Sequence, residues 1–187
     1  MSQIIFPSTG KEYTEQTYRA AVAEARARGI KYLIFASTGG YVAEKVLEIG
    51  VPEDIKTIMV THAYGSREAN TNRMPEELRQ RCKDAGIIVV TAGHALSGVE
   101  RSLSGMFKGV YPVEIIAHTL RMFGAGTKVA VEIAAMAADA GEIPVGEPVM
   151  CVGGTGTGAD TALILKAAYS AKLLETKIEE YVCKPTV

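Results

Sequence analysis

Four segments of the sequence place small, hydroxyl-bearing or imidazole side chains directly after short apolar runs. They are residues 37–40, 62–67, 94–101 and 153–158. If the apolar runs are strands of a parallel sheet, the four segments meet at its carboxyl edge, where such sheets bind ligands. We therefore expect one ligand crevice to which all four segments contribute.

The first of these segments has the composition of a phosphate-binding loop. Ser37, Thr38, Gly39 and Gly40 separate an apolar run, residues 32–36, from a segment with helical periodicity. Two hydroxyls and two glycines suit a loop whose backbone N–H groups meet an anion at a helix N-terminus. The pattern favours binding of a phosphorylated small molecule, and the alternative is an ordinary capped turn.

The second glycine-rich segment contains Gly153, Gly154, Thr155 and Gly156. Its glycine spacing resembles a dinucleotide-binding pattern, but that pattern opens a helix, whereas residues 161–165 are β-branched and aliphatic and predict a strand. We therefore reject dinucleotide binding. Two interpretations stay open, namely a backbone nest for an anion or a flat ring, and a simple flexible turn.

Three further side chains are expected near the crevice. His62 and His94 each follow a predicted strand, and each either bonds a ligand or has a structural role. No carboxylate stands at ligand spacing from them, so we predict no metal site. Arg101 is either a second phosphate or carboxylate clamp or an exposed charge, and Gly65, in the loop after His62, completes the candidate binding residues.

The elements that position these loops alternate between apolar runs and amphipathic helices, which is the signature of a parallel α/β sheet. Two consecutive helices, residues 111–122 and 127–140, interrupt the alternation, and the tail at residues 177–183 is a candidate edge strand. Strands are predicted at residues 32–36, 57–61, 87–90, 148–152 and 161–165, the last of them antiparallel to the others.

The composition of the sequence argues against several classes of protein. The net charge of −1 is scattered along the chain and only 6% of residues are aromatic, which argues against nucleic-acid binding. The N-terminus lacks the features of a signal peptide, and the most apolar stretch, residues 129–140, contains Glu132 and Asp139 and is too short to span a membrane. Three cysteines without metal-type spacing fit a reducing compartment, so a cytoplasmic protein is expected.

The same apolar stretch, residues 129–140, also predicts a partner. Glu132 and Asp139 fall on nearly the same face of an otherwise apolar helix. Burial of these carboxylates would require pairing or a subunit interface. We therefore expect a homo-oligomer.

The chain resembles a stand-alone member of the pyruvate kinase C-terminal-domain-like family over almost its whole length. The resemblance rests on the segments LIFASTGGYVAEKVLE, HALSGVERSLSGMFKGVYPVEIIAHTLRMFG, KVAVEIAAMAADAGEIPV and VGGTGTGADTALILK. It implies a single domain over residues 1–187, a three-layer α/β/α sandwich whose mostly parallel mixed sheet has about five strands, one of them antiparallel. It also implies that the catalytic barrel of pyruvate kinase is absent, so phosphoenolpyruvate chemistry is not expected.

The resemblance also bears on the ligand. In allosteric pyruvate kinases the loop that corresponds to residues 37–40 holds the phosphate of an effector, and close stand-alone relatives are associated with flavin mononucleotide (FMN). The leading hypothesis is therefore an FMN-binding protein, in which Ser37, Thr38 and Gly39 take the phosphate and residues 153–156 take the ring or ribityl chain.

Two other functions stay open from the sequence. The first is a regulatory or sensor module that binds a sugar phosphate without catalysis. The second is a hydrolase or transferase that uses a histidine as general base, although no nucleophile, base and orienting group can be identified together in the sequence. Whether the protein is an enzyme, such as a flavin-dependent oxidoreductase, is left undecided.

Overall fold

The predicted strands all form, and they join one sheet. The computed structural model describes residues 3–186, in which seven strands lie in the order β1-β7-β6-β5-β2-β3-β4. Their bounds are β1 (Ile4–Phe6), β2 (Tyr32–Ala36), β3 (Lys56–Val60), β4 (Ile88–Val90), β5 (Pro148–Gly153), β6 (Thr161–Lys166) and β7 (Lys177–Pro185). β6 is antiparallel to both of its neighbours and all other pairs are parallel, which confirms a mostly parallel sheet with one antiparallel strand.

The sheet differs from the expectation in two details. It has seven strands rather than about five, because β1 and β7 extend it beyond β6. The tail is also not an edge strand, since β7 lies between β6 and β1, with Ile4 opposite Cys183. A three-residue strand such as β1 is too short for periodicity to distinguish it from a loop.

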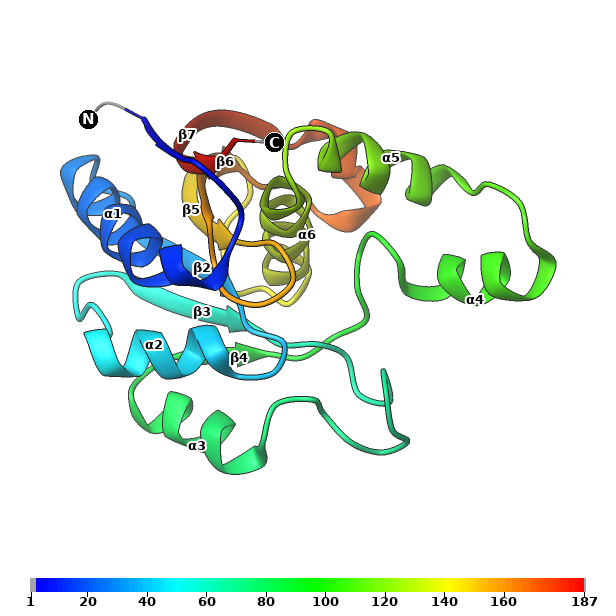
Figure 1. Ribbon diagram of the computed structural model, residues 1–187, viewed down its shortest axis with the longest axis horizontal. Coiled ribbons are helices and arrows are strands. Elements are labelled where there is room, and N and C mark those ends of the chain that lie inside the picture. Colours follow the sequence, from blue (N-terminus) through cyan, green and yellow to red (C-terminus); the bar gives the residue numbers. More distant parts are fainter. Residues whose placement is uncertain (1–2, 187) are drawn as a thin grey trace.

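Helices cover both faces of the sheet, as Figure 1 shows. The helices are α1 (Thr14–Ala27), α2 (Tyr41–Ile49), α3 (Glu76–Asp84), α4 (Gly98–Phe107), α5 (Pro112–Arg121) and α6 (Ala125–Asp139), with 3-10 turns η1 (Lys11–Tyr13) and η2 (Ser170–Glu175). Side chains alternate along β2, so Leu33 and Phe35 pack in the cluster with α1, α2 and α3, while Ile34 packs with α6. The result is the expected three-layer α/β/α sandwich.

Helix α6 is part of the chain's own core. Twelve of its fifteen residues are buried, and it packs against β5, β6 and α5. Its apolar composition is therefore explained without a subunit interface. Homo-oligomerisation stays a prediction, but α6 is not the surface that supports it.

Other sequence expectations concern membranes and thiols. Within residues 3–186, none of the helices is long and apolar enough to cross a membrane. Cys82, Cys151 and Cys183 are free and buried, and burial raises the pKa of each thiol. Thiols of this kind are inert at neutral pH.

Candidate functional site

The order of the strands creates a crevice between β2 and β5. From β2 the chain moves outward through β3 to β4, and it then returns to place β5 on the other side of β2. In open α/β sheets, ligands bind at such a reversal, outside the carboxyl ends of the strands. A pocket of about 310 Å³ lies there, lined by Ala36, Ser37, Thr38, Gly39, Tyr41, Val42, Arg73, Val129, Gly154, Gly156, Thr157 and Gly158.

One wall of the pocket is the loop that leads from β2 into α2. The Ser37 hydroxyl is buried and accepts a hydrogen bond from the Ala43 backbone N–H at 3.1 Å, so this side chain satisfies one of the N–H groups in the first turn of α2. Within residues 3–186, the backbone N–H groups of Thr38, Gly39 and Gly40 donate to no protein acceptor. Thr38 and Gly39 line the pocket, so the loop offers an anion their two N–H donors and the Thr38 hydroxyl at the positive end of α2.

Gly40 is required by the geometry of this loop. Its φ of +108° lies in the region that favours glycine, and a Cβ there would come 2.5 Å from Leu78 Cδ2 on α3. The chain thus turns into α2 at a point where a side chain would collide with the neighbouring helix. Gly39 has no comparable constraint, since a Cβ would meet nothing within 4 Å.

The opposite wall is the glycine-rich loop after β5, which hydrogen bonds hold in shape. Asp160 is buried, and its Oδ2 accepts from the Thr155 N–H at 3.3 Å while its Oδ1 accepts from the Thr161 hydroxyl at 2.8 Å. The Ala159 N–H donates to Thr14 Oγ1 at 3.0 Å, which ties the loop to α1. A Cβ on Gly154 would come 2.4 Å from the Gly158 carbonyl oxygen, so the loop folds closely on itself.

Gly153 and Thr155 support this wall without lining the pocket. A Cβ on Gly153 would lie 2.6 Å from the Gly126 carbonyl oxygen, so the absence of a side chain allows β5 to approach α6. Thr155 Oγ1 is buried and has no hydrogen-bond partner within residues 3–186. Both residues therefore fix the position of the neighbours that face the pocket.

Arg73 brings a positive charge to the pocket from a third element. It belongs to the loop between β3 and α3, and this loop is held by Asn72, whose Nδ2 donates to the His62 carbonyl at 2.9 Å. Asn72 Oδ1 also accepts from the Met74 N–H at 2.9 Å, and Met74 is buried in the core. Sequence reasoning missed Arg73, because no motif marks it in a polar loop and only the fold brings it to the pocket.

The two strand-end histidines lie against each other. The ring centroids of His62 and His94 are 4.3 Å apart, at the ends of β3 and β4. Burial and the neighbouring His94 lower the pKa of His62, and the charges of Arg73 and Arg101 lower it further. His62 is therefore neutral at pH 7. Arg73, whose charge contributes to the lowered His62 pKa, also lines the pocket.

A buried carboxylate orients the second histidine. His94 Nδ1 lies 3.5 Å from Glu132 Oε2 on α6, and Glu132 also accepts from the Leu96 N–H at 3.0 Å and from Lys128 Nζ at 2.5 Å. Burial opposes ionisation of Glu132, but the hydrogen bond from His94 and the charge of Lys128 outweigh it and lower its pKa to about 2. Burial of Glu132 requires a partner, and Lys128 is that partner.

This arrangement limits the chemistry of the histidines. A carboxylate at Nδ1 makes the opposite ring nitrogen the basic one. In His94 that nitrogen, Nε2, is shielded from solvent and has no hydrogen-bond partner among residues 3–186. Direct proton transfer by His94 therefore requires a change that exposes Nε2.

A comparison with known families identifies the domain. The family described as "Pyruvate kinase, alpha/beta domain" matches residues 15–165. The chain belongs to this family. The match includes every residue that lines the pocket. The sheet of this pyruvate kinase alpha/beta domain also agrees with the architecture that the resemblance implied, since β6 is the one antiparallel strand among the described residues.

The predicted site residues of this pyruvate kinase alpha/beta domain fall into four groups. Ser37, Thr38, Gly39, Gly154 and Gly156 line the pocket together. Gly40, Gly153 and Thr155 shape its walls, and His62 and His94 form the adjacent pair. Gly65 and Arg101 are exposed outside the pocket, where Gly65 donates its N–H to the Thr71 carbonyl and Arg101 acts on His62 only through its charge.

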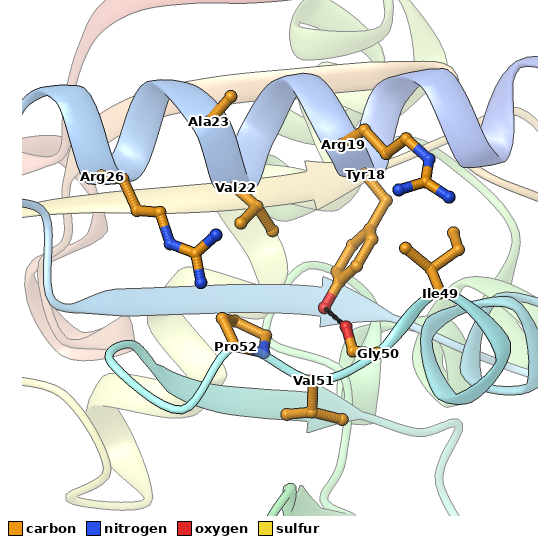
Figure 2. A pocket seen from close by; sticks show the side chains of 9 residues that line it. All are labelled: Tyr18, Arg19, Val22, Ala23, Arg26, Ile49, Gly50, Val51 and Pro52. Carbon is orange, nitrogen blue, oxygen red and sulfur yellow. Dashed lines mark hydrogen bonds between the residues drawn. The ribbon is translucent and has the colours of Figure 1, made fainter.

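A second pocket of about 360 Å³ lies between α1 and the turn that follows α2 (Figure 2). Its polar groups already have partners, since the Tyr18 hydroxyl donates to the Gly50 carbonyl at 3.2 Å and Arg26 pairs with Asp54 at 2.7 Å. It is also lined by none of the four strand-end loops. We therefore place the candidate site at the β2–β5 crevice.

Among residues 3–186, no group of three or more His, Cys, Asp or Glu side chains is placed to hold a metal ion.

Proposed function

We propose that the pocket at the β2–β5 crevice binds the phosphate group of a small molecule, and that FMN is its ligand. The observation that carries this proposal is the meeting of three kinds of anion-binding group in one pocket. These are the free N–H groups at the start of α2, the Thr38 and Thr157 hydroxyls, and the Arg73 guanidinium. Each is an established way for proteins to hold phosphate.

The residues of the pocket fit the parts of FMN in order. The phosphate would lie against Thr38 and Gly39, with Arg73 as its counter-charge. The ribityl chain would follow Gly154 and Gly156, where the backbone is accessible because side chains are absent. The flat ring would extend toward His62 and His94. A bound flavin supplies redox chemistry of its own, and the chain's part is to hold the phosphate and to present polar groups to the ring.

A sugar phosphate is the second candidate ligand, and the size of the pocket favours it. Ligand pockets span about 300 to 1,000 Å³, and the 310 Å³ found here is at the small end of that range. A sugar phosphate would fit within this volume, whereas FMN must extend beyond it. In that case the protein is a sensor or regulatory module without catalysis.

The two candidates are separated by what the purified protein binds. We would identify the co-purifying small molecule by mass spectrometry, and then measure binding of FMN, riboflavin and a panel of sugar phosphates by fluorescence quenching and thermal shift. A ligand that binds only the native state raises its stability. FMN is expected to bind at least about 10-fold more tightly than riboflavin, because one charge-assisted hydrogen bond is worth about 1.5–3 kcal/mol.

Three results would change this conclusion. Equal affinity for FMN and riboflavin would show that the phosphate is not held. Stabilisation by sugar phosphates alone would favour the sensor function. Binding of neither class would contradict the assignment of this pocket.

A further inference from the structure

Helices α4 and α5 form an arm, residues 98–123, which the rest of the chain covers only where α5 packs against α6. No residue of α4 is buried, and in α5 only Ala117 is. Figure 1 shows α4 apart from the helices that cover the sheet. A helix of ten residues is marginal in water by itself, and most helical stability in proteins comes from packing of an apolar face.

The exposed surface of the arm is apolar. Fourteen large hydrophobic side chains are exposed among the described residues, and eight of them belong to the arm. Val99, Leu103 and Met106 follow helical spacing on α4, which places them on one face. The eight are between 40% and 79% exposed, and they are Val99, Leu103, Met106, Phe107, Val110, Ile115, Met122 and Phe123.

Polar contacts hold the two helices of the arm together. Glu100 on α4 accepts a hydrogen bond from the Glu114 N–H at 3.1 Å, and the Ser104 hydroxyl donates to Glu114 Oε1 at 2.7 Å. The Tyr111 hydroxyl donates to the Leu103 carbonyl at 3.4 Å. The arm is therefore fixed in shape through its polar side chains, while its apolar side chains stay in solvent.

We infer that the arm is the interface of a homodimer, covered in solution by the arm of a second copy. A standard interface takes about 800 Å² from each partner, and eight large apolar side chains that are 40% to 79% exposed offer a surface of that order. Pairing of the same surface on both copies around a two-fold axis covers the arm of each copy and closes the assembly.

The charges of the arm favour pairing with a second copy of the chain over binding to a membrane. Glu100, Arg101, Lys108, Glu114 and Arg121 give both signs on one arm. Mixed charges suit a rim that meets its own symmetry mate, whereas helices that lie on anionic membranes carry a predominantly basic polar face. The dimer would also fix α4, and with it the Arg101 charge that acts on His62.

The test is the mass of the full-length protein in solution, measured by light scattering and sedimentation velocity from about 1 to about 100 μM. The wild type is expected at twice the chain mass. The double variant Met106→Glu/Phe107→Glu is expected at the mass of one chain, with an unchanged circular dichroism spectrum, because both side chains are exposed. Leu174→Glu is the matched control, since Leu174 is 80% exposed on η2, and it is expected to stay dimeric.

Each other outcome overturns the inference. A wild-type mass other than that of a dimer contradicts the closed arm-to-arm pair. A double variant that remains dimeric shows that another surface makes the contact. A monomeric wild type that binds vesicles of anionic phospholipid shows that a membrane covers the arm.

Discussion

Replacement of Glu132 by glutamine removes the carboxylate that balances the buried ammonium group of Lys128. Glu132 and Lys128 are 3% and 6% exposed, and Lys128 Nζ lies 2.5 Å from Glu132 Oε2. Loss of one partner of a buried pair costs about 3–5 kcal/mol, because the other charge is left without compensation. A fall of the Glu132 pKa from its ordinary 4.5 to about 2 corresponds to about 3 kcal/mol, which agrees with this range.

We therefore expect Glu132→Gln to lower the free energy of unfolding at pH 7 by about 3 kcal/mol and the Tm by about 10 °C. Urea unfolding followed by circular dichroism measures the first quantity. The matched control is Glu15→Gln, which breaks the pair of Glu15 and Arg19 at 2.8 Å with the same i,i+4 spacing, but both side chains are more than half exposed. That control should lose less than about 1 kcal/mol.

The deficit of Glu132→Gln should depend on pH in a defined direction. The folded pKa of Glu132 is lowered, so its contribution is present above the unfolded pKa and is lost as the pH falls from about 5 toward 2. Burial also lowers the pKa of Lys128, so at high pH the neutral amine needs no counter-charge and the deficit shrinks again. The difference between wild type and variant is therefore greatest near neutral pH.

A second substitution separates lost charge balance from lost packing. Lys128→Met added to Glu132→Gln removes the uncompensated charge, and the double variant is expected to recover most of the stability, because apolar replacements of buried pairs are often neutral. A Glu132→Gln deficit below about 1 kcal/mol, or one that does not change with pH, would refute the view that this pair is ionised and buried.

Three other substitutions test the pocket and its walls. Gly153→Ala should lower the free energy of unfolding in urea by about 1–3 kcal/mol, because its Cβ would meet the Gly126 carbonyl. Its control is Gly93→Ala, which should be neutral because a Cβ there would meet nothing within 4 Å. Equal effects of the two substitutions would contradict the close packing of β5 on α6. Arg73→Ala should weaken FMN binding by about 10- to 100-fold with an unchanged Tm, since Arg73 is exposed, and undiminished affinity would remove Arg73 from the site. Tyr18→Phe should lower the free energy of unfolding by about 1 kcal/mol, because the hydrogen bond from Tyr18 to Gly50 is lost, and it should leave FMN affinity unchanged. A loss of FMN affinity in this variant would instead place the ligand in the pocket beside α1.

Local sequence patterns predicted the sheet and its loops because each depends on neighbouring residues. The run of Tyr32 to Ala36 followed by small residues and a helical period identifies strand, loop and helix without further information. The antiparallel direction of β6 was also predicted. The internal position of β7 was not, because it depends on pairing with β1, more than 170 residues away in the chain.

The missed parts of the site are long-range contacts. Arg73 reaches the pocket because Asn72 holds its loop against the His62 carbonyl, and His94 meets Glu132 across 38 residues of sequence. No local period reports such contacts. Ser37 is a different case. Its residue type predicted either capping or phosphate binding, and the structure adds that its hydroxyl accepts from the Ala43 N–H in the first turn of α2.

The central claim, that α2 and its loop hold a phosphate, is tested most directly by titration of FMN into Thr38→Asp. A carboxylate about 4 Å from the phosphate would oppose binding by about 4 kcal/mol, so affinity should fall at least about 100-fold. The fold should be retained, because an acidic side chain at a helix N-terminus is favourable, and Thr38→Ser should bind like the wild type. Equal FMN affinity in Thr38→Asp and the wild type, or absence of FMN binding by the wild type, would contradict the account.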